Sequence, residues 1–201
     1  LGEDGATHQI LEDIGMMKML PGMTVINPCD YNQTKLATIA LGDHVGPAYL
    51  RFGRPKWPIF TPENTKFQIG KGIKFLDGND ISIFATGHML WQALEAEKIL
   101  FSLGISCEVI NIHTIKPLDE EIILESIKKT KCAISCEEHN IIGGLGESIS
   151  RLISEKHPIP FKVIGVNDSF GESGKPLDLL EKYNLNPESI KEAALEVIDK
   201  K

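Results

Sequence analysis

The sequence predicts an α/β protein with an open, mostly parallel sheet that carries helices on both faces. Short apolar runs typical of strands alternate with longer runs whose apolar residues follow helical spacing, and this alternation characterises parallel α/β units. The 201 residues are 42% hydrophobic and 24% charged, which is the balance of an ordinary globular chain. Because strand–helix–strand crossovers are right-handed, the helices should cover both faces of the sheet.

The first 65 residues contain two helix–strand pairs. Apolar residues at helical spacing begin at Ile10, and Pro21 with Gly22 should end that helix. Asp30 is a suitable N-cap for the second helix, because its short carboxylate can accept a backbone N–H of the first turn. We expect helices over residues 10–20 and 31–41, and strands over residues 23–27 and 48–52.

The stretch from residue 53 to residue 66 interrupts this alternation and predicts a domain boundary. Its three prolines are separated by aromatic residues, which favours an extended linker. We therefore divide the chain into residues 1–65 and residues 66–201. Two strands make too small a sheet to be stable alone, so the first segment should pack on residues that precede Leu1 or on another chain.

The second segment is long enough to have a core of its own. Residues 73–76 and 81–85 flank the turn sequence Asp77-Gly78-Asn79-Asp80, which predicts a β-hairpin. Gly104 should end the long helix that follows. Further strands are expected over residues 106–112, 131–136 and 161–166, and helices over residues 88–103, 117–128, 146–156, 177–183 and 187–199.

The composition narrows the class of protein. A net charge of −7 argues against binding to nucleic acid or to anionic membranes, and no apolar run is long enough to span a bilayer. We expect a cytoplasmic protein in which Cys29, Cys107, Cys132 and Cys136 are buried, reduced thiols. Cys132 and Cys136 share one face of a strand, but no second pair stands at metal-binding spacing, so we expect no metal site.

The stretch Gly2-Glu3-Asp4-Gly5-Ala6-Thr7-His8-Gln9 places two acids, a hydroxyl, an imidazole and an amide among glycines. Glycines allow backbone angles closed to other residues, and Thr7 or Asp4 can cap the helix that follows. A polar loop at a helix N-terminus suits a phosphorylated or hydroxyl-rich ligand. The alternative interpretation is a capped surface turn without a ligand.

This stretch resembles the signature of transketolases, in the domain that binds the pyrimidine end of thiamine diphosphate. Further motifs of that family follow in the family's order, at residues 50–55, 115–119, 138–139, 143–147 and 173–176. The similarity covers most of the chain, and it is greatest to the separate C-terminal subunit of split transketolases. The resemblance implies a transketolase C-terminal domain, preceded by a partial α/β pyrimidine-binding domain.

The resemblance also implies three contacts to the substrate. Asp4 matches an acid that accepts a hydrogen bond from a donor-sugar hydroxyl, and His8 matches a position near the substrate and the diphosphate end of the cofactor. Arg54 matches the arginine that holds the sugar phosphate with its planar fork of donors. The alternative interpretation, without a ligand, is that Asp4 is a helix-cap acid and that His8 is a histidine on the surface of a helix. Arg51 is the alternative phosphate ligand, and strand alternation places it opposite Arg54 unless Gly53 bends the chain.

Transketolase chemistry, as the resemblance implies it, moves a two-carbon ketol unit between sugar phosphates, with thiamine diphosphate supplying the difficult step. The family's proton-donating glutamate, its pyrimidine-binding aromatics and its Mg²⁺ motif are not among these residues. We therefore expect this chain to contribute no catalytic residue and to be inactive alone. The working form should be a homodimer joined by N-terminal transketolase subunits, and we expect coding sequence upstream of Leu1.

Two other interpretations of the function stay open. Another thiamine enzyme, 1-deoxyxylulose-5-phosphate synthase or the β subunit of a 2-oxoacid dehydrogenase, would share the architecture, and a non-catalytic assembly or binding module belongs to a different class. Glu137, Glu138 and His139 precede a glycine loop at residues 143–146, which suits either an anion or close packing of the loop against the sheet. His88 is either a site residue or simply a helix start.

Overall fold

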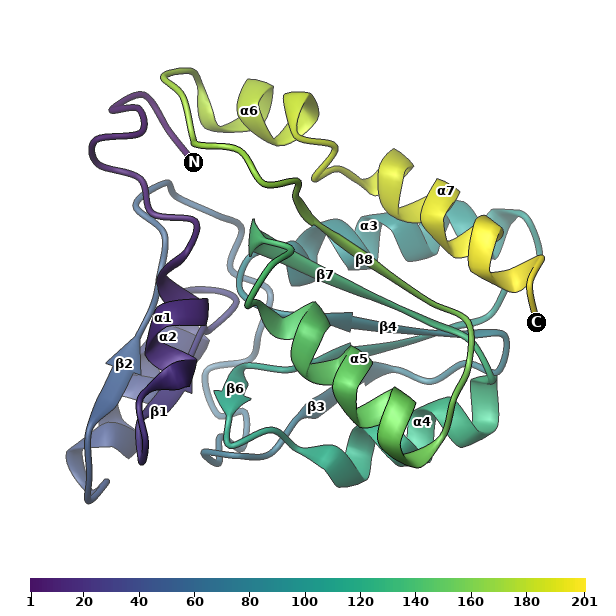
Figure 1. Cartoon of the computed structure of the whole chain (residues 1–201), viewed down its shortest axis with the longest axis horizontal. Coiled ribbons are helices and arrows are strands. Elements are labelled where there is room, and N and C mark those ends of the chain that lie inside the picture. Colours follow the sequence, from purple (N-terminus) through teal and green to yellow (C-terminus); the bar gives the residue numbers. More distant parts are fainter.

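The computed structural model describes residues 1–201 and arranges them around two sheets (Figure 1). The small sheet has the strand order β2-β1-β6, and the large sheet has the order β3-β5-β4-β7-β8. The α/β fold with helices flanking the sheets is therefore confirmed. The strands are β1 (Thr24–Ile26), β2 (Ala48–Leu50), β3 (Ile73–Leu76), β4 (Ile81–Ala85), β5 (Cys107–Asn111), β6 (Thr114–Lys116), β7 (Ala133–Asn140) and β8 (Phe161–Val166). The helices are α1 (Asp13–Met19), α2 (Tyr31–Gly42), α3 (Met89–Ser102), α4 (Glu120–Thr130), α5 (Leu145–Lys156), α6 (Pro176–Lys182) and α7 (Pro187–Ile198).

The large sheet is parallel except at one edge. Strands β5, β4, β7 and β8 run parallel, and β3 pairs antiparallel with β5. Helices α3 and α7 cover one face, while α4 and α5 cover the other (Figure 1). Successive side chains of β4 point to opposite faces of the sheet. Ile83 belongs to the core cluster that includes residues of α3, and Phe84 belongs to the cluster that includes residues of α5.

The predicted hairpin between residues 73–76 and 81–85 is wrong. Strand β5 lies between β3 and β4, so that Ile73 pairs with Asn111 on one side of β5 and Ile81 pairs with Cys107 on the other. The connecting turn crosses the end of β5, where Asp80 Oδ2 accepts the backbone N–H of Ser106 at 2.8 Å. The residues of the turn permit a tight reversal. However, the turn sequence alone cannot show that β5, which comes later in the chain, lies between β3 and β4.

The small sheet has a third strand that the sequence did not reveal. Strand β6 comes from the second half of the chain and pairs antiparallel with β1, with Val25 opposite Lys116 and Ile26 opposite Thr114. Strands β1 and β2 are equally short, but β6 contains a single apolar residue, Ile115, between Thr114 and Lys116, and so lacks the apolar run on which sequence recognition depends. The two halves of the chain are therefore joined by a shared sheet, and the division at residue 65 stays a prediction.

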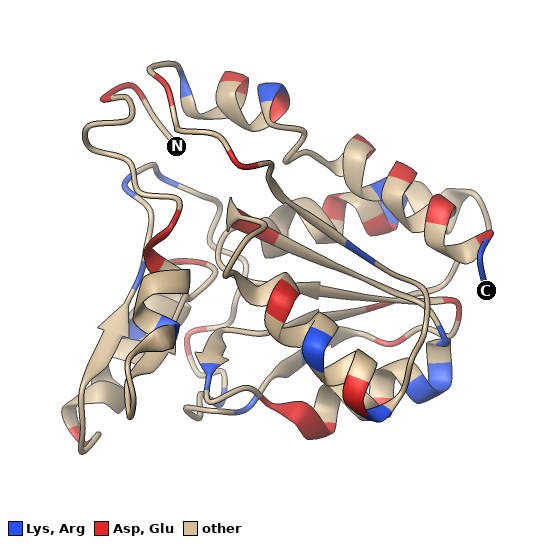
Figure 2. Ribbon diagram, in the orientation of Figure 1, with Lys and Arg blue, Asp and Glu red and all other residues tan.

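Helix boundaries follow local capping chemistry in some places and depart from it in others. Asp30 caps α2 as expected, with its carboxylate accepting the N–H of Gln33 at 2.9 Å. Helix α1 begins later than predicted, after an N-cap Glu12 that forms no side-chain cap bond, so neither Thr7 nor Asp4 caps it. Figure 2 shows Lys and Arg interspersed with Asp and Glu along α5 and α7. None of the helices combines the length and apolar character needed to cross a bilayer.

Candidate functional site

The N-terminal loop (residues 2–9) is held by the segment that precedes α6, although the two stand at opposite ends of the chain (Figure 1). Gln9 Nε2 donates to the carbonyl oxygen of Glu172 at 3.1 Å. Gly5 has a φ of +77°, and a Cβ there would lie 2.4 Å from Ser173 Oγ. Only glycine suits both the backbone angle and the space, so the shape of the loop depends on the C-terminal segment.

Asp4 and Arg54 form an ion pair and both line a cleft of about 510 Å³. Their side chains remain 42% and 76% exposed, respectively. His8 lines the same cleft, is exposed, and has its Nδ1 atom 2.9 Å from Thr7 Oγ1. The fold therefore brings the three sequence-predicted contact residues to one cleft, with polar groups that are open to a ligand.

Arg51 is engaged by the protein itself. Its Nε donates to Asp13 Oδ2 at 2.8 Å, and its Nη2 donates to the carbonyl oxygen of Glu138 at 2.9 Å. The hydroxyl of Tyr49 donates to the same Asp13 oxygen at 2.8 Å. Strand β2 ends before Arg51, so the expectation that strand alternation separates Arg51 from Arg54 does not apply. Arg51 connects α1, β2 and β7.

A cluster of three further residues that line the cleft, Trp57, His88 and Glu138, was not anticipated from the sequence. Trp57 stacks on His88, with ring centroids 4.3 Å apart and planes 2° from parallel. His88 Nδ1 lies 3.2 Å from Glu138 Oε2, and burial lowers the pKa of His88, which favours a neutral ring that donates from Nδ1. The sequence assigned Trp57 to a linker, and only the pairing of β4 with β7 brings His88 beside Glu138.

Glu137 and the glycine loop form the N-terminal cap of α5. The Glu137 carboxylate accepts the backbone N–H groups of Leu145 at 2.7 Å and of Gly146 at 2.8 Å, and burial raises its pKa to about 7. A Cβ at Gly146 would lie 2.5 Å from Val163 Cγ1. The anion-binding geometry expected here is thus satisfied by the chain's own carboxylate, and the loop packs closely against the sheet.

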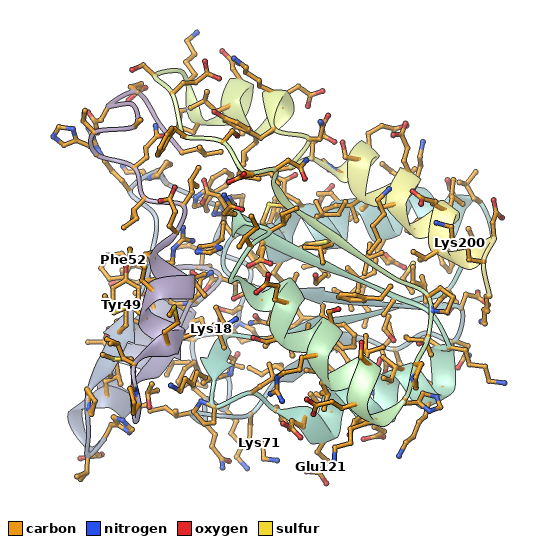
Figure 3. The ribbon with its side chains drawn as sticks, in the orientation of Figure 1. Lys18, Tyr49, Phe52, Lys71, Glu121 and Lys200 are labelled. Carbon is orange, nitrogen blue, oxygen red and sulfur yellow. The ribbon has the colours of Figure 1, made fainter.

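His139 and Lys18 connect α1 to the large sheet. His139 Nδ1 donates to the carbonyl oxygen of Asn140 at 2.6 Å, so Nε2 is free to accept the Gly15 N–H at 3.3 Å. Lys18 extends from α1 toward the start of α5 and donates to the carbonyl oxygen of Gly144 at 2.5 Å (Figure 3). Burial lowers the pKa of both side chains. His139 and Lys18 therefore hold α1, in the first half of the chain, against β7 and α5 in the second half.

The four cysteines are free and buried, as predicted. Burial raises the pKa of Cys107 to about 12, which leaves its thiol protonated and unreactive at neutral pH. No group of three or more His, Cys, Asp or Glu side chains is arranged to hold a metal ion.

Two family models match the two parts of the chain. The family model of the transketolase pyrimidine binding domain matches residues 1–58, and that of the transketolase C-terminal domain matches residues 70–190. The chain belongs to the transketolase family. The resemblance carried by the N-terminal loop and the later motifs is therefore confirmed.

Curated relatives of this transketolase-family chain are longer than it is. A putative transketolase C-terminal section from Methanocaldococcus jannaschii is 43% identical, over 100% of this chain and 63% of its own length. A 6-deoxy-6-sulfo-D-fructose transketolase subunit from Clostridium sp. is 40% identical, over 98% of this chain and 62% of its own length. A 1-deoxy-D-xylulose-5-phosphate synthase from Caldanaerobacter subterraneus is 34% identical over 98% of this chain. The chain spans less than two thirds of each relative.

Solved structures agree with this assignment. A split-gene transketolase, described as an inactive β4 tetramer, superposes with a TM-score of 0.91 and 36% identity, covering 96% of this chain and 63% of that one. A transketolase from Pichia stipitis superposes with a TM-score of 0.77 over 98% of this chain at 24% identity, which shows a shared fold. The transketolase-family chain is thus similar, over nearly its whole length, to the C-terminal section of split transketolases.

Proposed function

We propose that this chain helps to transfer a two-carbon ketol unit between sugar phosphates, as the C-terminal part of a thiamine-diphosphate-dependent transketolase. The observation that carries the proposal is the Asp4–Arg54 pair at a cleft that His8 also lines. A carboxylate accepts hydrogen bonds from sugar hydroxyls, and a guanidinium binds phosphate through two parallel donors. The cleft therefore offers both an acceptor for a sugar hydroxyl and a donor for a phosphate.

Each of the three residues has a distinct role in this proposal. Asp4 orients the donor sugar through a hydroxyl, Arg54 holds the phosphate, and His8 contacts the substrate and the diphosphate end of the cofactor. The exposure of Asp4 and Arg54 suits a ligand that is presented from outside the chain. Thiamine diphosphate, when bound, supplies the carbanion chemistry, and we assign the diphosphate and its Mg²⁺ mainly to regions outside this chain.

The working assembly in this proposal is a homodimer of this subunit joined by N-terminal transketolase subunits. Met19 beside the small sheet and Val45 next to edge strand β2 are 82% and 95% exposed, and exposed apolar groups beside an open edge favour coverage by further protein. The relative from Clostridium sp. is named as a subunit, and the solved split-gene protein is described as an inactive β4 tetramer. We expect the isolated chain to be inactive. We also propose that the enzyme acts in the cytoplasm, because its four cysteines are free thiols, and in the pentose phosphate pathway, because the proposed reaction is ketol transfer between sugar phosphates.

Reconstitution tests the proposal. The full-length subunit that contains these residues is purified and mixed with its N-terminal transketolase subunit, thiamine diphosphate and Mg²⁺. Ketol transfer from xylulose 5-phosphate to ribose 5-phosphate is expected from the mixture and from neither subunit alone. Turnover of pyruvate with glyceraldehyde 3-phosphate in its place would instead identify a 1-deoxyxylulose-5-phosphate synthase. Complex formation without any turnover would support an assembly module.

A further inference from the structure

Residues 52–59, which include Arg54, form a segment without helix or strand between two fixed points. Arg51 fixes its start, because the guanidinium is bound to the protein as described above. Asp30 fixes its end, where Oδ2 accepts the backbone N–H of Thr61 at 2.7 Å. Between these points no backbone group of the segment bonds to another backbone group. The path of the chain at Arg54 therefore depends on side-chain packing.

Trp57 supplies most of that packing. Every residue of the segment except Pro55 and Trp57 is exposed. The indole stacks on His88 with ring centroids 4.3 Å apart, and it packs against the core cluster that includes residues of β4 and α3. A Cβ at Gly53 would lie 3.7 Å from the indole Nε1, so the chain turns back over the ring at the residue before Arg54.

His88 is a firmly held support for the indole. It is 7% exposed, and its Nδ1 lies 3.2 Å from Glu138 Oε2 in β7. The preceding residue, Gly87, donates its N–H to the carbonyl oxygen of Asn27 at 3.1 Å. Gly87 has a φ of +58°, and a Cβ there would lie 2.7 Å from Asn27 Nδ2. His88 is thus fixed by contacts to both halves of the chain, because Asn27 directly follows β1.

We propose that Trp57 is a positioning residue for Arg54: its stack on His88 fixes the turn of residues 53–57 and so places the guanidinium in the cleft. This role rests on the function proposed above, in which Arg54 binds the sugar phosphate. The side chain of Arg54 has one polar partner in the chain, Asp4, which that function assigns to a sugar hydroxyl. Once a substrate engages both side chains, the backbone of the turn locates Arg54, and Trp57 holds that backbone.

Kinetics of the reconstituted enzyme test whether Trp57 acts through Arg54. Trp57→Ala removes the stack and should raise KM for xylulose 5-phosphate about tenfold, with kcat little changed, because a phosphate contact stabilises substrate and transition state alike. Trp57→Phe keeps an aromatic ring and should recover most of the affinity, since the indole N–H has no hydrogen-bond partner to lose. In an Arg54→Ala background, Trp57→Ala should raise KM no further, because residues that act as a unit are not additive.

Proteolysis follows the position of the turn without any substrate. Lys56 is exposed and precedes Trp57, so trypsin can cut between them when the turn opens. His88→Asn removes the ring of the support, keeps an amide donor and leaves this bond unchanged. In the full-length subunit it should speed this cleavage about tenfold. The reference in the same digest is the bond between Lys66 and Phe67, whose own ring stack is not altered.

Two results would overturn the role of Trp57. One is equal cleavage after Lys56 in the wild type and in His88→Asn, and the other is additive effects of Trp57→Ala and Arg54→Ala on KM. If His88→Asn fails to fold, the additivity of the other two variants still decides. An unchanged KM in Arg54→Ala alone would overturn the phosphate contact, whereas faster cleavage after Lys56 would still support the positioning of the turn.

Discussion

Arg51 and Asp13 form an ion pair that ties the end of β2 to the first residue of α1, with Arg51 Nε 2.8 Å from Asp13 Oδ2. Their side chains are 14% and 1% exposed. Arg51 also donates to the carbonyl oxygen of Glu138 in β7. One guanidinium therefore joins elements from the small sheet and the large sheet, and its donors are directed at the protein.

Arg51→Ala should destabilise the fold strongly. Removing one partner of a buried ion pair leaves the other charge uncompensated, which typically costs about 3–5 kcal/mol. We expect the free energy of unfolding, measured by urea denaturation, to fall by about 3 kcal/mol. The control is Arg54→Ala, whose exposed pair with Asp4 should contribute less than about 1 kcal/mol. Equal stability losses in the two variants would contradict the structural role assigned to Arg51.

Arg54→Ala should instead impair use of the substrate in the reconstituted enzyme. Losing a charged hydrogen bond to phosphate costs about 2 kcal/mol, which corresponds to a rise of roughly 30-fold in KM for phosphorylated sugars. Arg54→Lys keeps the charge without the planar fork, and its KM should lie between those of the other two enzymes. An unchanged KM in Arg54→Ala, with stability intact, would show that the phosphate contact lies elsewhere.

The stability of the protein should fall in mild acid because of His113. This side chain is fully buried, stacks on Phe67 with ring centroids 4.2 Å apart, and has its pKa lowered to about 4 by burial, although Asp119 opposes the shift. The unfolded chain binds a proton near pH 6.5, so between these values the unfolded state binds more protons than the folded state. The free energy of unfolding is therefore unaffected by His113 above about pH 6.5, and it falls by about 3 kcal/mol as the pH falls toward 4 and the unfolded chain takes up a proton.

The measurement is urea denaturation of the wild type and of His113→Gln across this pH range. Burial also lowers the pKa of His88 and His139, so the informative quantity is the difference between the two proteins. That difference should be constant above pH 7 and should shrink as the pH falls from 6.5 to 4. Parallel curves throughout would show that His113 does not titrate in this way.

Gly146→Ala should destabilise the start of α5. Its Cβ would lie 2.5 Å from Val163 Cγ1 and 2.9 Å from Ser135 Oγ, and overpacking of this kind typically costs about 1–3 kcal/mol. The matched control is Gly42→Ala in α2, where a Cβ meets nothing within 4 Å. Because alanine is the better helix former, this control should be neutral or stabilising by up to about 1 kcal/mol. Thermal unfolding of both variants separates the steric effect from helix propensity.

Local chemistry explains why some elements were predictable. Asp30 was recognised as an N-cap from its position alone, and its carboxylate does accept the Gln33 N–H. The structure adds that Asp30 also accepts the N–H of Thr61 at 2.7 Å. The second contact spans 31 residues, and no spacing within one helix predicts it. The same limit explains the mistaken hairpin, because the strand inserted beside β3 and β4 follows both of them in the sequence.

The sequence by itself determined the α/β class, the family and the identity of the polar residues in the N-terminal loop, because periodicity, caps and motifs are properties of neighbouring residues. Only the tertiary structure decided which of those residues meet. It paired Asp4 with Arg54, committed Arg51 to Asp13, and placed His88 between Trp57 and Glu138. These contacts depend on strand order and on the junction of two sheets, and both are set by burial summed over the whole chain.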